Sequence, residues 1–191
     1  MAPVPEILLN VARNPFLAVG LPIGLGIASG FSVDPQSIWA KSLKQPPGAP
    51  PDAAFGPVWT ALYGMMGYAS YLCSTAIDMG ATFETKALAE NALGEYYVQL
   101  GLNLLWMPTM YGLKNPILAL GNIGILAGLV WDMTGKMSKL DTNPNTKYLL
   151  VPYALWVSYA AYLNAGIVYL NWNNTTAQTL AKKLHQPEHQ L

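Results

Sequence analysis

The sequence has 191 residues, of which 52% are hydrophobic and only 10% are charged, and its formal net charge is zero. An average soluble domain carries roughly 25% charged residues, so this composition favours one membrane domain that spans residues 1–191. The lack of a basic run excludes a nucleic-acid partner, because phosphates are bound mainly by clustered Lys and Arg. The single cysteine, Cys73, excludes an internal disulfide and a thiolate metal cluster.

An uncharged run over residues 14–33 predicts the first membrane-spanning helix, because about 20 apolar residues cross the hydrocarbon core. Pro22 should kink this helix. Its small residues Gly20, Gly24 and Gly26 should let a neighbouring backbone approach closely. The residues before this run lack a compact basic start, so no cleaved secretory signal is predicted and the membrane segments themselves should carry the targeting information.

The first loop, residues 34–54, is long for so small a protein. A loop of some twenty residues is more often functional than a mere connector, so a segment that closes over a ligand is predicted. Proline stiffens a loop and thereby lowers the entropy lost when it closes. The residues of interest in it are Trp39, Lys41, Lys44, Pro46, Pro47, Pro50 and Pro51.

The second membrane-spanning helix is predicted over residues 55–77, which carry no charge from Pro57 to the end. At 1.5 Å per residue this charge-free part is about 30 Å long, enough to cross a bilayer. Trp59 and Tyr63 are four residues apart. The small pair Gly64 and Gly67 follows them, which places aromatic rings beside close-packing positions. Such a face is expected to meet neighbouring helices or a flat ligand.

A polar, acidic connector is predicted over residues 78–95, with room for a short surface helix, and the third spanning helix over residues 96–111. Gln99, Asn103 and Trp106 share one face of that helix. Polar side chains at membrane depth are costly without partners, so they should point into the bundle or a cavity. Hydrogen bonds between helices and contacts with a ligand both remain open.

The fourth and fifth spanning helices are predicted over residues 117–133 and 148–172. Gly121, Gly124 and Gly128 give the fourth helix a small-residue spacing that should favour close packing in the bundle or in a dimer. The fifth helix repeats residues of interest at a spacing of three to four. These are Trp156, Ala160, Leu163 and Asn164.

A polar tail is predicted over residues 173–191. His185 and His189 lie in it without a nearby acid or cysteine, so no metal site is predicted. Five spans put the two termini on opposite sides of the membrane. Lys and Arg divide equally between the two sides, so charge does not predict the orientation.

Three stretches, together with the first-loop prolines, resemble the signature segments of the translocator protein family, which is also called the tryptophan-rich sensory protein or peripheral benzodiazepine receptor family. They are FGPVWTALYGMMGYASYL from Phe55, YYVQLGLNLLW from Tyr96 and LLVPYALWVSYAAYLN from Leu149. The resemblance extends over about residues 15–172. It implies an all-α, integral membrane bundle of five transmembrane helices, usually a homodimer, with a pocket that opens toward the first loop.

The resemblance also implies the ligands. Members of the family bind porphyrins such as protoporphyrin IX, and animal members bind cholesterol and synthetic drugs of the benzodiazepine type. For a eukaryotic member it implies a multi-pass protein of the mitochondrial outer membrane, with the endoplasmic reticulum as the alternative. No cofactor is required, and the porphyrin is expected as a ligand.

Site residues are carried over position by position. Trp59 and Trp156 are similar to two tryptophans that flank the tetrapyrrole in bacterial members and are implicated in its light-dependent breakdown. Asn103 and Trp106 match the third-helix wall of the pocket. Ala160 and Leu163 match fifth-helix positions where small size governs ligand and sterol affinity. The expected ligand-binding residues are Trp39, Pro47, Phe55, Trp59, Tyr63, Asn103, Trp106, Trp156, Ala160 and Leu163.

The leading functional prediction is a membrane-embedded tetrapyrrole-binding protein that acts in porphyrin transport, sensing or disposal. A sterol or lipid transporter that uses the same pocket is the first alternative, although the basic residue of the animal sterol pattern is missing after Tyr169 and the next one is Lys182. The second alternative is an enzyme that degrades porphyrin photo-oxidatively through Trp59 and Trp156. The helices contain no acid–base dyad, activated nucleophile or metal cluster, so no conventional catalytic residues are predicted.

Overall fold

The computed structural model describes residues 4–80 and 82–172. The predicted polar tail, with Lys182, His185 and His189, lies outside the described residues. Within the described ranges every element of regular secondary structure is a helix, which confirms the all-α prediction.

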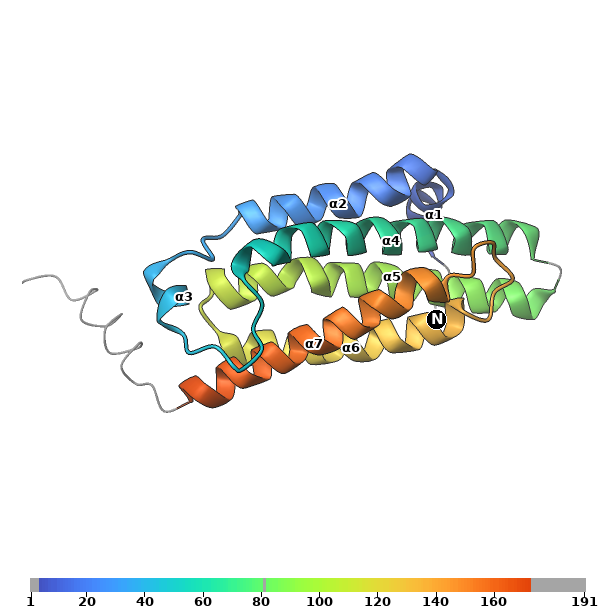
Figure 1. Ribbon diagram of the computed structural model, residues 1–191. Coiled ribbons are helices and arrows are strands. Elements are labelled where there is room, and N and C mark those ends of the chain that lie inside the picture. The colour runs from blue at the N-terminus through green and yellow to red at the C-terminus, as the bar shows by residue number, and fades with distance from the viewer. Residues whose placement is uncertain (1–3, 81, 173–191) are drawn as a thin grey trace, which may run out of the picture.

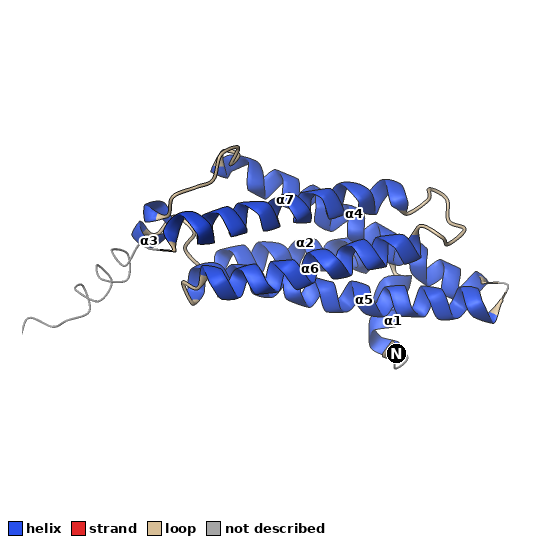
Figure 2. Cartoon of the chain, turned by 90° about the horizontal axis from the view of Figure 1, so that it is seen from below, coloured by secondary structure: helices blue, strands red, loops and turns tan. Residues whose placement is uncertain are grey.

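The helices in chain order are α1 (Glu6–Arg13), α2 (Pro15–Phe31), α3 (Ile38–Ser42), α4 (Asp52–Met79), α5 (Phe83–Met107), the π-helical turn η1 (Pro108–Gly112), α6 (Pro116–Met137) and α7 (Lys147–Asn171). The five long helices α2, α4, α5, α6 and α7 run along the bundle, whereas α1 lies across one end and α3 lies in the loop at the other (Figure 1). The same long helices lie side by side when the molecule is turned, and Figure 2 shows no strand in the described part of the chain.

The third long helix differs from its predicted bounds. It begins at Phe83 rather than at residue 96, so most of the expected connector over residues 78–95 is helical. The side chain of Thr82 caps the new start by accepting a hydrogen bond from the amide of Thr85 at 3.2 Å. The polar residues that suggested a loop lie mostly outward, while Ala89, Ala92 and Leu93 are buried in the core. The four other long helices lie close to their predicted ranges.

The end of α5 shows how proline creates a contact between helices. Pro108 has no backbone N–H, so the carbonyl of Leu104 loses its usual partner four residues on. The hydroxyl of Ser29 on α2 donates to that carbonyl at 2.8 Å. Beyond Pro108 the chain continues as η1, and the predicted continuous helix over residues 96–111 therefore ends at Met107.

The glycines of α6 do not pack inside the bundle. A Cβ atom added at Gly121, Gly124 or Gly128 would meet no atom within 4 Å, and all three residues are exposed. Within this chain, the predicted packing role of these glycines is therefore wrong. On α2, a Cβ at Gly20 or Gly24 would also meet no atom within 4 Å, so the close approach predicted at these two positions is wrong. By contrast, a Cβ at Gly26 would lie 2.3 Å from the ring of Tyr63, so this glycine allows the close approach of a side chain and not of a backbone.

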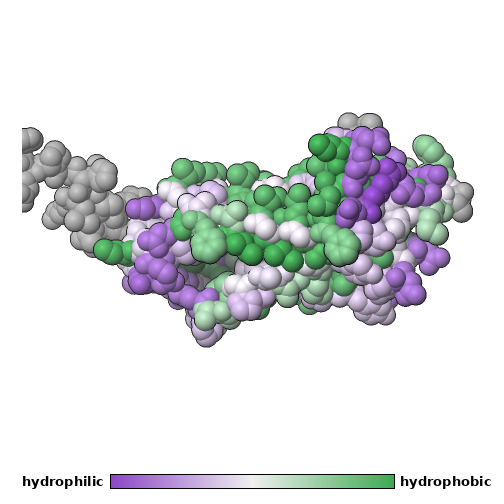
Figure 3. Space-filling view, turned by 90° about the horizontal axis from the view of Figure 1, so that it is seen from above, coloured by the Kyte–Doolittle hydropathy of each residue, from purple (hydrophilic) through white to green (hydrophobic). Residues whose placement is uncertain are grey.

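The hydrophobic core runs along the bundle between the long helices. Its largest fully buried side chains include Met66, Tyr96, Leu126 and Tyr153. Many large apolar side chains face outward instead, and Figure 3 shows a hydrophobic band over the middle of one face with hydrophilic residues toward the ends. An outward apolar surface of this extent is typical of contact with lipid or with another chain.

By length and hydropathy, α6 is long and apolar enough to cross a membrane on its own. Helices α1 and α2 meet this criterion only if they are taken together as one span, and they are bent by 105° at their junction. The other long helices carry buried polar residues such as Ser70, Gln99 and Asn164, which lower their hydropathy although these side chains point inward. The number of spans therefore stays a prediction.

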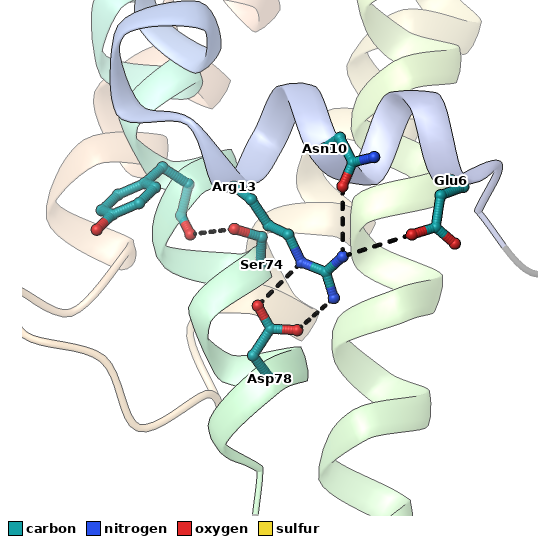
Figure 4. A network of polar contacts seen from close by, with 6 residues as sticks. Glu6, Asn10, Arg13, Ser74 and Asp78 are labelled. Atoms are coloured by element: carbon teal, nitrogen blue, oxygen red, sulfur yellow. Dashed lines mark hydrogen bonds and ion pairs between the residues drawn. The ribbon is translucent and has the colours of Figure 1, made fainter.

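The junction of α1 and α2 is fixed by polar contacts, of which Figure 4 shows those made by Arg13. Asn14 caps α2 by accepting hydrogen bonds from the amides of Phe16 and Leu17 at 3.0 and 3.2 Å. Arg13 donates from Nε and Nη2 to the carboxylate of Asp78, at 3.0 and 2.5 Å. This two-pronged pair joins the end of α1 to the end of α4, so it holds α1 across the bundle.

We expect the Arg13–Asp78 pair to make the attachment of α1 sensitive to acid. The hydrogen bond from Arg13 lowers the pKa of the Asp78 carboxyl group, which lies outside the charge-free part of α4. A lowered pKa stabilises the folded state fully above the unfolded value of about 3.9, and this contribution is lost as the pH falls through the folded pKa. At pH 7, amide hydrogens of residues 6–13 should therefore exchange faster in Asp78→Asn than in the wild type. Below about pH 4, where the wild type also loses the ion pair, this difference between the two proteins should disappear.

Asp34→Asn, at the opposite end of the bundle, is the control for this comparison, and each variant is compared with the wild type at the same pH. Equal exchange of residues 6–13 at pH 7 in Asp78→Asn and in the wild type would contradict the expectation.

Candidate functional site

The loop between α3 and α4 crosses over α7 (Figure 1). We call residues 43–51 the strap. One end is held at Lys44, whose backbone N–H and C=O both bond to the side-chain amide of Asn171, at 3.1 and 3.0 Å. Pro46 packs on Gly166, where an added Cβ would lie only 2.5 Å from the proline ring. A glycine is therefore required at position 166 for the strap to lie this close.

The middle of the strap is held by tyrosines of α7. Tyr162 donates from its hydroxyl to the carbonyl of Pro47 at 3.0 Å, and Tyr159 donates to the carbonyl of Gly48 at 2.5 Å. Gly48 has φ of +83°, a backbone conformation that favours glycine. Three side chains of α7 thus bond to the backbone of the strap.

An aromatic cluster lies where α4 and α7 meet beside the strap. The ring of Trp156 lies 6.1 Å from Phe55, 6.5 Å from Trp59 and 5.6 Å from Tyr159, measured between centroids. Tyr159 in turn stacks on Tyr162 at 6.3 Å with an interplanar angle of 22°. We call these five residues the aromatic surface.

Trp59 and Trp156 touch edge to face, with an interplanar angle of 83°. A flat ring held between two parallel faces would need them about 7 Å apart, since each stacked pair lies about 3.5 Å apart. The two tryptophans therefore form adjoining walls of one surface in this structure. The indole Nε1 of Trp156 is buried and has no hydrogen-bond partner in the described part of the chain.

A chain of hydrogen bonds lies beneath the aromatic surface. Tyr63 donates to Oδ1 of Asn103 at 2.5 Å, and Nδ2 of Asn103 donates to the hydroxyl of Tyr153 at 3.0 Å. That hydroxyl donates to Oε1 of Gln99 at 2.5 Å. The ring of Tyr153 lies 6.5 Å from Trp59, edge to face. Gln99 and Asn103 thus point into the bundle, as expected, and their polar groups bond to other helices.

The remaining expected site residues fall into two groups. Ala160 packs against the main core beside the aromatic surface, and Leu163 is buried one turn further along α7. Trp39 lies in a second apolar cluster with Leu43, Met110, Ala119 and Ile167. Trp106 packs against both clusters and donates from Nε1 to Asn164 at 3.1 Å, so it joins them.

Tyr159, Tyr162 and Asn171 were not among the predicted site residues. Tyr159 lies three residues after Trp156, and Tyr162 lies three residues after Tyr159, so the spacing placed each tyrosine beside the aromatic residue one turn before it. No sequence pattern indicated a role for Asn171, because its side chain bonds to the backbone of a loop that is distant in the sequence. In the described ranges, no group of three or more His, Cys, Asp or Glu side chains could hold a metal ion.

Comparison with known proteins matches residues 18–170 to the TspO/MBR family. The translocator protein homolog of Schizosaccharomyces pombe is 38% identical over 168 residues, which cover 87% of this chain and 97% of the relative. The tryptophan-rich protein TspO of Chlorobaculum tepidum is 33% identical over 81% of this chain and 94% of its own length. The human translocator protein is 32% identical over 74% of this chain and 80% of its own length. By this match over most of its length, the chain belongs to the TspO/MBR family.

Proposed function

We propose that the protein binds a tetrapyrrole such as protoporphyrin IX inside a membrane, and that it acts in porphyrin transport, sensing or disposal. The observation that carries the proposal is the aromatic surface, where Phe55, Trp59 and Trp156 adjoin under a proline-rich strap. A porphyrin is a large flat apolar ring, and each aromatic contact with it contributes roughly 0.5–1.5 kcal/mol beyond burial. The indole N–H of Trp156 is buried without a partner among the described residues, so a ligand that displaces the side chains covering it gains a hydrogen-bond donor there.

The proposal includes a multi-pass membrane protein in which α2, α4, α5, α6 and α7 each cross the bilayer. The outward apolar side chains and the inward polar ones support this arrangement. The 28 residues of α4 are about 42 Å long, more than the hydrocarbon core requires. From the family resemblance we propose the mitochondrial outer membrane as its location, with the endoplasmic reticulum as the alternative.

A homodimer is part of the proposal as well. The exposed glycines of α6 form a surface without side chains on the outside of the bundle, and the exposed Ile117 and Ile125 lie beside it. Small residues on an outward helix face allow a second helix to approach closely in a membrane.

The sterol and the photochemical alternatives act at the same site. A sterol would use the apolar surface without needing a charged partner, so it should compete with the porphyrin if it is the true ligand. Photo-oxidative breakdown would need the porphyrin beside Trp59 and Trp156, whose rings are in contact. Both alternatives therefore become outcomes of one binding experiment.

We expect protoporphyrin IX to quench the tryptophan fluorescence of the purified protein in lipid nanodiscs with saturation. Trp59→Ala combined with Trp156→Ala should weaken binding by about tenfold or more, because two aromatic contacts are removed. Trp172→Ala, which removes an exposed tryptophan at the end of α7, should leave the affinity unchanged. Unsaturable quenching, or equal affinity in the double variant, would argue against the proposal.

Two further arms separate the alternatives. Displacement of the porphyrin by cholesterol at similar concentrations would favour the sterol transporter. Loss of porphyrin absorbance under light, with a product that is absent in the tryptophan variants and in empty nanodiscs, would favour the enzyme.

A further inference from the structure

Two phenol groups of α7 point at the same short piece of the strap. Tyr159 and Tyr162 lie one turn apart with stacked rings, and their hydroxyls donate to the successive carbonyls of Gly48 and Pro47. The pair therefore forms two neighbouring donors whose present acceptors are both backbone oxygens of one loop.

These two bonds can be exchanged at low cost. Pro47 and Gly48 are exposed, and the side chain of Tyr162 is 49% exposed. Carbonyl groups at exposed positions can bond to water once a protein donor leaves them. The tyrosine hydroxyls can thus be released without leaving a buried polar group unpaired on the strap.

The same tyrosines form one edge of the aromatic surface. Tyr159 lies 5.6 Å from Trp156, which in turn contacts Phe55 and Trp59. A ring that lies on the tryptophans would therefore bring its own edge near the two hydroxyls. Tetrapyrroles of the protoporphyrin type carry carboxylates at one edge only.

We propose that Tyr159 and Tyr162 are the polar anchor of the binding site. When the strap lifts, their hydroxyls pass from the carbonyls of Gly48 and Pro47 to the carboxylate oxygens of a ligand whose ring lies on Trp59 and Trp156. This inference rests on the proposed function and narrows the ligand to a flat apolar ring with a carboxylate edge. A hydrogen bond to a carboxylate is roughly twice as strong as one to a neutral carbonyl, so such a ligand displaces the strap.

The test compares protoporphyrin IX with its dimethyl ester, which has the same ring and no charge. The wild type in nanodiscs should bind the free acid about tenfold more tightly than the ester, since hydrogen bonds to a charged group are stronger than those to a neutral one. Tyr159→Phe combined with Tyr162→Phe keeps both rings and removes both hydroxyls, so this ratio should fall close to one. Tyr169→Phe, an exposed tyrosine of the same helix, should leave the ratio unchanged.

The outcomes distinguish hydroxyls that bind the ligand from hydroxyls that only hold the strap in place. They also distinguish failure of this inference from failure of the proposed function. If the hydroxyls only hold the strap down, the double variant binds acid and ester more tightly by the same factor, and the anchor is overturned. Saturable binding with an unchanged ratio overturns the anchor alone. Failure of the wild type to bind either compound overturns both proposals. If the double variant does not fold, Tyr162→Phe alone gives the same test, because it removes only a hydroxyl of a partly exposed side chain. The ratio of acid to ester affinity should then fall below that of the wild type.

Discussion

Gly67→Ala is expected to lower the free energy of unfolding by about 3 kcal/mol, at the upper end of the cost of overpacking. A Cβ atom at this position would lie 2.2 Å from the carbonyl oxygen of Ala18 and 3.0 Å from Cα of Val19. Both atoms belong to the backbone of α2, so no side chain can turn aside to make room. The two helices would have to separate where they now touch.

Thermal unfolding in detergent measures this effect. For a chain of this size, 3 kcal/mol corresponds to a fall of roughly 6–12 °C in Tm. Gly64→Ala is the matched control, because its Cβ would meet only the side chain of Ile23, at an ordinary 3.7 Å. Alanine also favours a helix over glycine, so this control should be neutral or more stable than the wild type. Equal changes in Tm for both variants would refute the expectation.

These two glycines illustrate what the sequence could and could not predict about the fold. Their spacing on a charge-free helix correctly indicated a close contact between helices, and the contact is with α2 at Gly67. Inside the bundle the same argument failed for Gly121 and Gly124, which face outward. Spacing shows that residues share a helix face, but the face that turns inward depends on how neighbouring helices pack. The start of α5 was predicted too late along the chain, because the buried alanines of its first turns lie between polar residues that suggested a loop.

The candidate site was predicted in part. Phe55, Trp59 and Trp156 come together at one place, whereas Trp39 lies in a separate cluster that Trp106 joins to the main core. The resemblance supplied most of these residues, since composition and periodicity alone could not pair distant helices. The contacts of Asn171 and of the two strap carbonyls depend on the path of an irregular loop, which no periodic pattern encodes.

The second large effect is expected for Tyr153→Phe. Tyr153 is fully buried, and its hydroxyl accepts from Asn103 and donates to Gln99. Removing the hydroxyl leaves both amides without that partner, and each buried unpaired group costs about 1–3 kcal/mol. We expect a loss of about 2 kcal/mol, at the low end for two such groups, because polar groups of the unfolded chain in a membrane also find partners and the net loss is smaller.

A fall of roughly 4–8 °C in Tm would match this loss. Tyr148→Phe removes a hydroxyl from an exposed tyrosine of the same helix and should change Tm little. If the cost arises from the orphaned amide, then Gln99→Leu added to Tyr153→Phe should cost less than the sum of the two single variants, because the unpaired oxygen is removed with its partner. Strictly additive losses would instead mean that each side chain contributes only its own packing. The ring contact between Trp59 and position 153 survives in Tyr153→Phe, so the affinity for the proposed porphyrin ligand should be retained while stability falls.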